Sequence, residues 1–118
     1  MGLDLTLLPL DHDTLKWGYS HTVIPAGWAR ELHDPIHAMP RTPVPEDFTT
    51  YMGTTEDGER GYGQTKETPY GSPLDCVTVA QLLTLAKRKA VRDSPRNRAA
   101  WAFLSALDPS TRIALWWH

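Results

Sequence analysis

Two arginines stand at the start of a predicted helix, where positive charge is unusual. Ser94 and Pro95 have the residue types of an N-cap and a first helical position, and Arg96 and Arg98 follow in the first turn. The dipole favours acids at this end, so arginines gain nothing from it. Beside free backbone N–H groups and a serine, they are suited to bind an anion or an acidic partner. Because Arg96 and Arg98 are two positions apart, we expect only one of them to face a given ligand.

The two parts of the chain differ in charge, although the net charge is only −2. Residues 1–75 hold five basic and twelve acidic side chains, whereas residues 76–118 hold seven basic and two acidic ones. Such an asymmetry steers anions or acidic surfaces toward the basic end. Three of the cations are expected in the last turn of a helix, where they complement the dipole and need no further function: Lys87, Arg88 and Lys89.

A second candidate for ligand binding lies in the glycine-rich middle of the chain. Gly61–Lys66 and Pro69–Pro73 combine glycines, two tyrosines and a lysine. A nucleotide-binding loop uses such residues, with Tyr62 or Tyr70 stacking on a base, but the spacing matches neither the P-loop nor the dinucleotide fingerprint. The other interpretation is an ordered surface loop whose tyrosines pack on the sheet.

Histidines provide a third set of candidates. His33 and His37 have the i, i+4 spacing of a helical metal pair, and His12 lies between two aspartates. Pro35 stands between the first two histidines and should interrupt the helix that this spacing needs. We therefore expect exposed or hydrogen-bonded histidines and no metal site. A metal-dependent hydrolase that uses His12, His33 and His37 stays as an alternative.

Other catalytic signals are weak. Ser20 and His21 are neighbours in sequence, which does not create a nucleophile–base geometry, and the chain has no nucleophile elbow. Cys76 is the only cysteine, which excludes an intrachain disulfide, and a small buried thiol is its expected role. We therefore expect a protein that is not an enzyme and needs no cofactor.

The periodicity predicts an α+β fold in a single domain spanning residues 1–118. A small, mostly antiparallel sheet should include both terminal strands and pack against a C-terminal helical hairpin, with a loop-rich middle between Pro40 and Pro73. Thr78 and Gln81 have capping-box spacing at the first helix of the hairpin. The expected strands are 2–8, 19–24 and 111–118, and the expected helices are 27–33, 78–90 and 95–107.

Several function classes are excluded at this stage. No stretch of about 20 apolar residues is present, so we expect no membrane association. The amino terminus lacks a signal-peptide pattern, and the single cysteine fits a reducing compartment. A negative net charge and the lack of a groove-reading motif argue against duplex nucleic acid as a partner. The oligomeric state stays open, and a homo-oligomer is compatible with the sequence.

The chain also resembles small, uncharacterised bacteriophage proteins over most of its length. The residues that carry this resemblance are Met1–Pro9, Trp17–Thr22, Tyr70–Leu74, Arg98–Trp101 and Ala114–His118. The resemblance implies a viral accessory protein in the cytoplasm of an infected bacterium. Such a protein would act by binding, either blocking a host or defence protein or sequestering a nucleotide signal.

These observations favour a non-enzymatic protein that sequesters a small anionic, nucleotide-like ligand in a counter-defence role. An inhibitor of a host or bacterial-defence protein is the first alternative. Arginine would take the phosphate, and an aromatic ring would stack on the base. The predicted ligand-binding residues are Tyr62, Lys66, Tyr70, Ser94, Arg96, Arg98 and Trp101.

Overall fold

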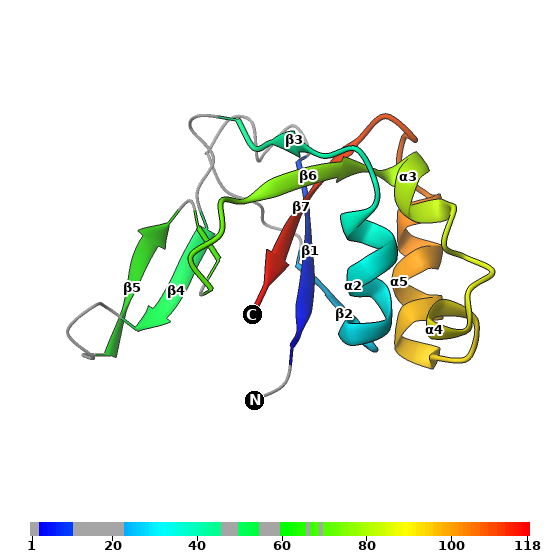
Figure 1. Cartoon of the computed structure of the whole chain (residues 1–118), viewed down its shortest axis with the longest axis horizontal. Coiled ribbons are helices and arrows are strands. Elements are labelled where there is room, and N and C mark those ends of the chain that lie inside the picture. Colours follow the sequence, from blue (N-terminus) through cyan, green and yellow to red (C-terminus); the bar gives the residue numbers. More distant parts are fainter. Residues whose placement is uncertain (1–2, 11–22, 46–49, 55–59, 66, 69) are drawn as a thin grey trace.

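Two strands from opposite ends of the chain pair side by side inside a five-stranded antiparallel sheet. The computed structural model describes residues 3–10, 23–45, 50–54, 60–65, 67–68 and 70–118. The strand order is β2-β1-β7-β6-β3, so β1 and β7 lie away from its edges (Figure 1). The predicted α+β fold, with both terminal strands in an antiparallel sheet, is confirmed. The strands of this sheet are β1 (Leu5–Pro9), β2 (Ile24–Ala26), β3 (Thr42–Pro43), β6 (Asp75–Thr78) and β7 (Arg112–Trp117).

Alternating side chains explain why β1 and β7 take central positions. Leu5 lies opposite Trp117, and Leu7 lies opposite Leu115, which places these four side chains on one face. All four are buried in the main core, together with Ile113. The other face of the same strands contributes to a second, smaller buried cluster: Leu8, Leu10, Leu74, Cys76 and Ala114.

The four helices that the structure describes pack together on one face of the sheet (Figure 1). Their buried side chains meet the apolar face of β1 and β7 and complete the main core. No helix of the described residues is long and apolar enough to cross a membrane. The helices are α2 (Ala29–His37), α3 (Val79–Leu83), α4 (Lys89–Arg92) and α5 (Pro95–Ser105).

Local capping chemistry sets the start of two helices, as predicted. The Thr78 side chain accepts a hydrogen bond from the Gln81 backbone, and the Gln81 side chain accepts one from the Thr78 backbone at 2.7 Å. Ser94 caps α5 by accepting from the Asn97 backbone at 3.2 Å, and Pro95 takes the first helical position. Each device satisfies backbone donors that a helix start leaves without intrahelical partners.

The predicted helix over residues 78–90 is two short helices, which corrects the interpretation of Lys87 and Arg88. Leu85 N–H bonds to the Leu82 carbonyl at 3.0 Å, a tight i to i−3 turn that ends α3 and keeps Leu85 buried. Arg88 is then the N-cap of α4, so Arg88 and the preceding Lys87 are not in the last turn of a helix. Lys89 lies in the single turn of α4, and the prediction of a last-turn position holds for it alone of the three cations.

The prediction that Pro35 interrupts the helix after His33 is wrong. Helix α2 continues through Pro35 to His37. A proline inside a helix costs about 3 kcal/mol. Leu32 and Ile36 are both 0% exposed, and complete burial of such side chains contributes about 1.5–3 kcal/mol each, enough to offset the proline.

Two further predictions about strands need correction. The second strand does not stop before Pro25 but contains it, which the sheet tolerates because β2 is an edge strand. Residues 19–22 of that prediction lie outside the described residues. Within the predicted loop-rich middle, β4 (Thr50–Thr54) and β5 (Arg60–Thr65) pair as a separate two-stranded ribbon with a register irregularity between Met52 and Thr54.

Candidate functional site

The predicted anion site at the start of α5 divides into buried structural residues and exposed arginines. Ser94 is 4% exposed and Asn97 is 0% exposed, so both belong to the protein interior. The Asn97 amide donates to the carbonyls of Gly27 at 2.7 Å and Ala90 at 2.8 Å, and its Oδ1 accepts from Gly27 N–H at 2.7 Å. Ser94 thus caps helix α5, as predicted. Asn97 forms a structural clamp between α5, α4 and Gly27, a role that the sequence did not indicate.

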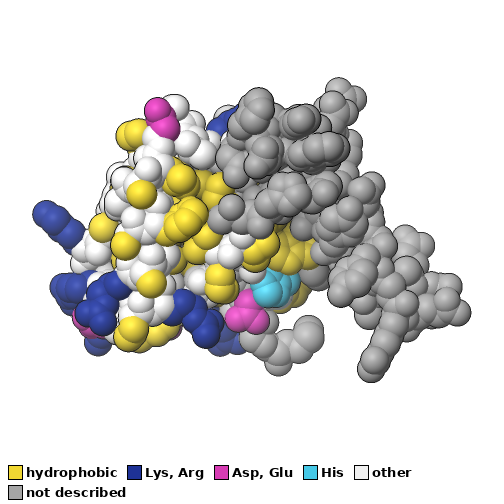
Figure 2. Space-filling view, turned by 180° about the vertical axis from the view of Figure 1, so that it is seen from behind, with side chains coloured by type: hydrophobic (Ala, Val, Ile, Leu, Met, Phe, Trp, Pro, Cys, Tyr) yellow, Lys and Arg dark blue, Asp and Glu magenta, His cyan; other side chains and the backbone are white. Residues whose placement is uncertain are grey.

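Arg96 and Arg98 are exposed, and neither forms an ion pair with another described residue. Arg96 lines a shallow apolar groove of about 340 Å³ beside β2 and α5. Val23 and Phe103, which also line it, are 60% and 44% exposed. Figure 2 shows Lys and Arg side chains gathered at the lower left, next to exposed apolar atoms of the helical layer.

The predicted aromatic contacts have different environments. Trp101 is 3% exposed, and its indole N–H donates to the Leu82 carbonyl at 2.8 Å, so it is a core residue that offers no ring face to a ligand. Tyr70 is 52% exposed and lines a pocket. The side chain of Tyr62 and all of Lys66 lie outside the described residues.

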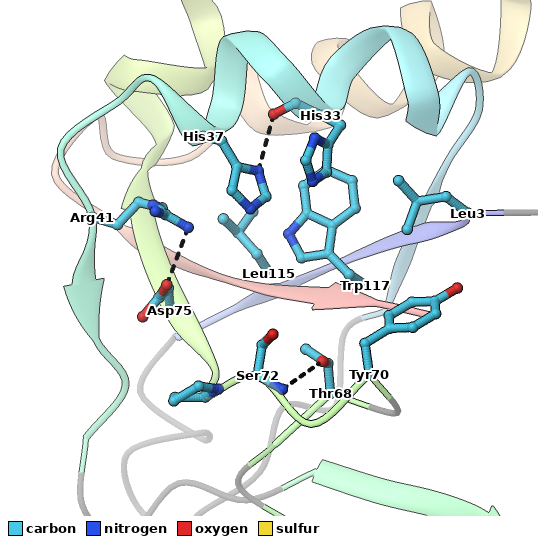
Figure 3. Close-up of a pocket in the computed structure, with 11 residues that line it drawn as sticks. Leu3, His33, His37, Arg41, Thr68, Tyr70, Ser72, Asp75, Leu115 and Trp117 are labelled. Carbon is cyan, nitrogen blue, oxygen red and sulfur yellow. Dashed lines mark hydrogen bonds and ion pairs between the residues drawn. The ribbon is translucent and has the colours of Figure 1, made fainter.

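That pocket, the α2 pocket, has a volume of about 240 Å³ and is bounded by α2, by residues 68 and 70–73, and by the ends of β6 and β7 (Figure 3). Of the predicted ligand-binding residues whose side chains the structure describes, Tyr70 alone lines the pocket. Its lining residues are Leu3, His33, His37, Arg41, Thr68, Tyr70, Ser72, Pro73, Asp75, Leu115 and Trp117.

Three aromatic side chains form one wall of the α2 pocket. The rings of His33 and His37 stack with centroids 3.8 Å apart and an angle of 27° between their planes. The Trp117 ring lies 5.2 Å from His33 and 5.5 Å from His37, centroid to centroid. Figure 3 shows both imidazoles descending from α2 toward the indole. Continuation of α2 through Pro35 creates this wall, because it places both histidines on one helix face.

Burial lowers the pKa of His37 below its ordinary value of 6.5. Removal from water is the main cause, since it disfavours the charged imidazolium. The hydrogen bond to the His33 backbone carbonyl and the charge of Asp75 act in the opposite direction, whereas the neighbouring His33 and Arg41 add to the lowering. His37 is therefore predominantly neutral at neutral pH, and its ring can accept a proton, a hydrogen bond or a metal ion.

An ion pair between Arg41 and Asp75 lies at one side of the pocket. Arg41 Nη1 donates to Asp75 Oδ2 at 3.3 Å, with both side chains about one-third exposed. Figure 3 shows this pair beside His37. A guanidinium carries five N–H donors, and Asp75 accepts one of them, so Arg41 retains donors for an anion or a carbonyl.

The opposite side of the pocket is a closed turn. Thr68 N–H donates to the Ser72 carbonyl at 2.8 Å, Gly71 N–H donates to the Thr68 carbonyl at 2.9 Å, and Ser72 N–H donates to Thr68 Oγ1 at 3.3 Å. Gly71 has φ +80°, a conformation that favours glycine. These bonds hold Tyr70 at the mouth of the pocket without help from a ligand.

Cys76 does not contribute to the pocket. It is 1% exposed, and burial raises the pKa of its thiol to about 11. A buried thiol that stays protonated at neutral pH is a poor nucleophile. The expectation of an inert buried cysteine therefore agrees with its environment.

Most residues of the α2 pocket were not identified from the sequence. Arg41, Asp75 and Trp117 come from three elements that long-range pairing brings together, and no local pattern links them. The spacing of His33 and His37 was the available signal, and Pro35 argued against it. Comparison with models of protein families, with curated proteins and with solved structures gives no match for the chain.

Proposed function

We propose that this protein binds a small anionic, nucleotide-like ligand in the α2 pocket without transforming it. The aromatic wall of His33, His37 and Trp117, with the Arg41 guanidinium beside it, is the observation that carries the proposal. Such a wall suits a flat heterocycle, and a guanidinium suits a phosphate. The proposal keeps the ligand class suggested by the sequence and moves its site from α5 to α2.

The size of the pocket limits what can enter it. Ligand pockets usually enclose about 300–1,000 Å³, so a volume of about 240 Å³ is small. It suits a single base or a mononucleotide with part of the molecule outside. Stacking of a base on an aromatic side chain contributes about 1–3 kcal/mol, and the half-exposed Tyr70 at the mouth offers a further ring.

Arg41 is the candidate for the phosphate. Two parallel N–H donors of a guanidinium match two phosphate oxygens, which gives orientation as well as attraction. Asp75 keeps Arg41 in place and also reduces the net positive charge beside the pocket. The affinity for the anionic part should therefore depend on ionic strength less than it would at an unpaired cluster of cations.

Binding is favoured over catalysis by the hydrogen bonds of the pocket. Among the described residues, no serine, threonine or cysteine donates a hydrogen bond to either histidine, and Thr68 Oγ1 instead accepts from the Ser72 backbone. An activated nucleophile needs a base within hydrogen-bonding distance. His12, the third histidine of the hydrolase alternative, lies outside the described residues.

A thermal-shift series tests the proposal. A panel of cyclic and linear nucleotides is added at concentrations up to about 100 times the dissociation constant, where binding stabilises the native state by about 2.7 kcal/mol. That corresponds to an increase of about 10 °C in the melting temperature of a domain of this size. Arg41→Gln should reduce the shift, and Arg92→Gln, which removes a comparable exposed arginine–aspartate pair on α4, should not.

The outcomes separate the two candidate anion sites. Loss of the shift in an Arg96→Gln/Arg98→Gln protein, with Arg41→Gln unaffected, would place the ligand on α5 and overturn the proposal. No shift with any nucleotide would also overturn it. The biological context, sequestration of a nucleotide signal during phage infection, is part of the proposal and rests on the sequence resemblance. Mass spectrometry of small molecules released from protein purified out of infected, defence-carrying cells tests that context.

The apolar groove beside α5 supports a second candidate, an inhibitor that docks on a host or defence protein. Exposed Val23 and Phe103 lie next to Arg96, a combination of apolar and cationic side chains that suits a protein surface. A stoichiometric complex with one host protein that is lost in Phe103→Asp, without any nucleotide shift, would favour this function over the first.

A further inference from the structure

The two histidines of α2 have hydrogen-bond partners of the kind that metal-binding histidines have. His37 Nδ1 lies 3.0 Å from the His33 carbonyl oxygen, and His33 Nδ1 lies 3.2 Å from Asp34 Oδ1. A carbonyl or an ionised carboxylate only accepts hydrogen bonds, so each Nδ1 carries the hydrogen. A neutral imidazole has one N–H, which leaves both Nε2 atoms with an unprotonated lone pair.

From this arrangement we infer that His33 and His37 form a two-histidine binding site for a divalent transition-metal ion, with Nε2 of each ring as ligand. Histidines that bind metals almost always donate the other ring N–H to a carboxylate or a backbone carbonyl, and both kinds of partner are present here. The inference rests on these two side chains and does not depend on the proposed nucleotide.

The two imidazoles are close enough to reach one metal ion after their rings turn. Nitrogen ligands lie about 2.0–2.1 Å from zinc, so two of them in a tetrahedral site are about 3.3 Å apart. The rings stack with centroids 3.8 Å apart and 27° between their planes, so their in-plane lone pairs do not yet converge. Chelation would require both rings to rotate about their side-chain bonds, which two half-buried residues allow without movement of the helix.

Two protein ligands leave the remaining positions to water or to another ligand. Within the described part of the chain, no group of three or more His, Cys, Asp or Glu side chains is placed to hold a metal ion. Asp75, the acid beside His37, is held by Arg41. An incomplete imidazole site favours Cu²⁺ over Ni²⁺ and Zn²⁺ and does not suit Mg²⁺ or Ca²⁺, which prefer oxygen ligands.

Trp117 provides a direct readout of metal binding. Its ring lies within 5.5 Å of both imidazoles, so a bound Cu²⁺ should quench its fluorescence. The full chain is titrated with Cu²⁺, Ni²⁺, Zn²⁺ and Mg²⁺, and the quenching is compared with that of Trp117→Phe. We expect one saturable site for Cu²⁺, weaker sites for Ni²⁺ and Zn²⁺, no response to Mg²⁺, and most of the quenching lost in Trp117→Phe.

Histidine variants decide whether the site is the one described. His33→Gln and His37→Gln should each weaken Cu²⁺ binding at least tenfold. His118→Gln removes another histidine, whose Nε2 lies 2.9 Å from Thr6 Oγ1, and should leave the affinity unchanged. Equal affinities in the wild type, His33→Gln and His37→Gln would overturn the inference, as would a loss confined to His118→Gln.

A measurement on the unmodified protein covers the case in which a variant does not fold. Substoichiometric Cu²⁺ should broaden the imidazole C–H resonances of His33 and His37 before those of His118. Broadening that begins at other histidines, with His33 and His37 unaffected, would overturn the inference independently of any substitution.

Discussion

Replacement of Asn97 by alanine should destabilise the whole fold, although this residue lies outside the α2 pocket. Its side chain is 0% exposed and joins three segments: the start of α5, the start of α4 at Ala90, and the link between β2 and α2. The link at Gly27 directly precedes Trp28, which adopts φ 55°, a left-handed conformation that starts α2. Asn97 therefore helps to set the path by which His33 and His37 reach the pocket.

The expected magnitude comes from the three hydrogen bonds that are lost. Each contributes about 1 kcal/mol net, and a buried acceptor left without a partner costs about 1–3 kcal/mol. The Ala90 carbonyl is in the second situation, because its bond to Asn97 is buried. The Gly27 groups are partly exposed and can bind water, so they lose less. The sum is about 3–4 kcal/mol, a large part of the total stability of about 5–15 kcal/mol that a domain has.

Urea unfolding followed by tryptophan fluorescence measures this loss. With a slope of about 2 kcal/mol per molar, Asn97→Ala should lower the midpoint by about 1.5–2 M. Ser94→Gly, which changes the cap of the same helix, should cost only a few tenths of a kcal/mol. A loss below about 1 kcal/mol for Asn97→Ala at an unchanged slope would refute the reasoning.

The isosteric Asn97→Asp variant separates hydrogen bonding from packing. It retains the acceptor for Gly27 N–H but places an oxygen against the carbonyls of Gly27 and Ala90. Because like dipoles then face each other in a buried site, it should be at least as destabilising as alanine. A near-neutral effect of Asn97→Asp would show that shape, and not the amide donors, maintains the clamp.

Three further predictions test other parts of the structure. Thr78→Ala should cost about 1 kcal/mol in urea unfolding by removing the capping box, and a neutral effect would contradict its role. Burial raises the pKa of Cys76 to about 11 from an ordinary 9.0, so the unfolded chain loses this proton at a lower pH than the folded protein. The free energy of unfolding should therefore keep its full Cys76 contribution below pH 9 and lose it as the pH rises toward 11. Cys76→Ala should remove this decrease, and an identical pH profile in the variant would contradict the assignment. If metal and nucleotide share the α2 pocket, Ni²⁺ should increase the affinity for the nucleotide, and the nucleotide should increase the affinity for Ni²⁺ by the same factor. Both affinities are corrected for Ni²⁺–nucleotide complexes in solution, and a factor of one would mean that the two ligands bind independently.

Features controlled by neighbouring residues were predictable from the sequence. The caps at Thr78 and Ser94 depend on residues three positions away, and the alternation of β7 depends on its own side chains. The break after Leu83 was not predictable, because Leu85 turns inward to reach a core built by distant elements. Helix α2 likewise continues past Pro35 because Ile36 is buried against that core. Local propensity could not show either effect.

The candidate site was less predictable than the fold for the same reason. Its walls come from α2, the residue pair Arg41 and Asp75, residues 68 and 70–73, and β7, so the pocket exists only once the sheet order is set. Arg96 and Arg98 could be identified from the sequence because positive charge at a helix start is unfavourable, and this depends only on neighbouring residues. In the structure both arginines are exposed, and Arg96 lines an apolar groove.

The charge of the α2 pocket links the two proposals. Arg41 and Asp75 cancel each other formally, and burial lowers the pKa of His37, which disfavours a positive charge on its ring. The described lining thus holds an aromatic ring more readily than it holds a phosphate, for which Arg41 is the candidate donor. A divalent ion on the two Nε2 atoms would add positive charge next to the ring-binding wall. We therefore expect the metal to strengthen nucleotide binding that Arg41 and the aromatic wall already support.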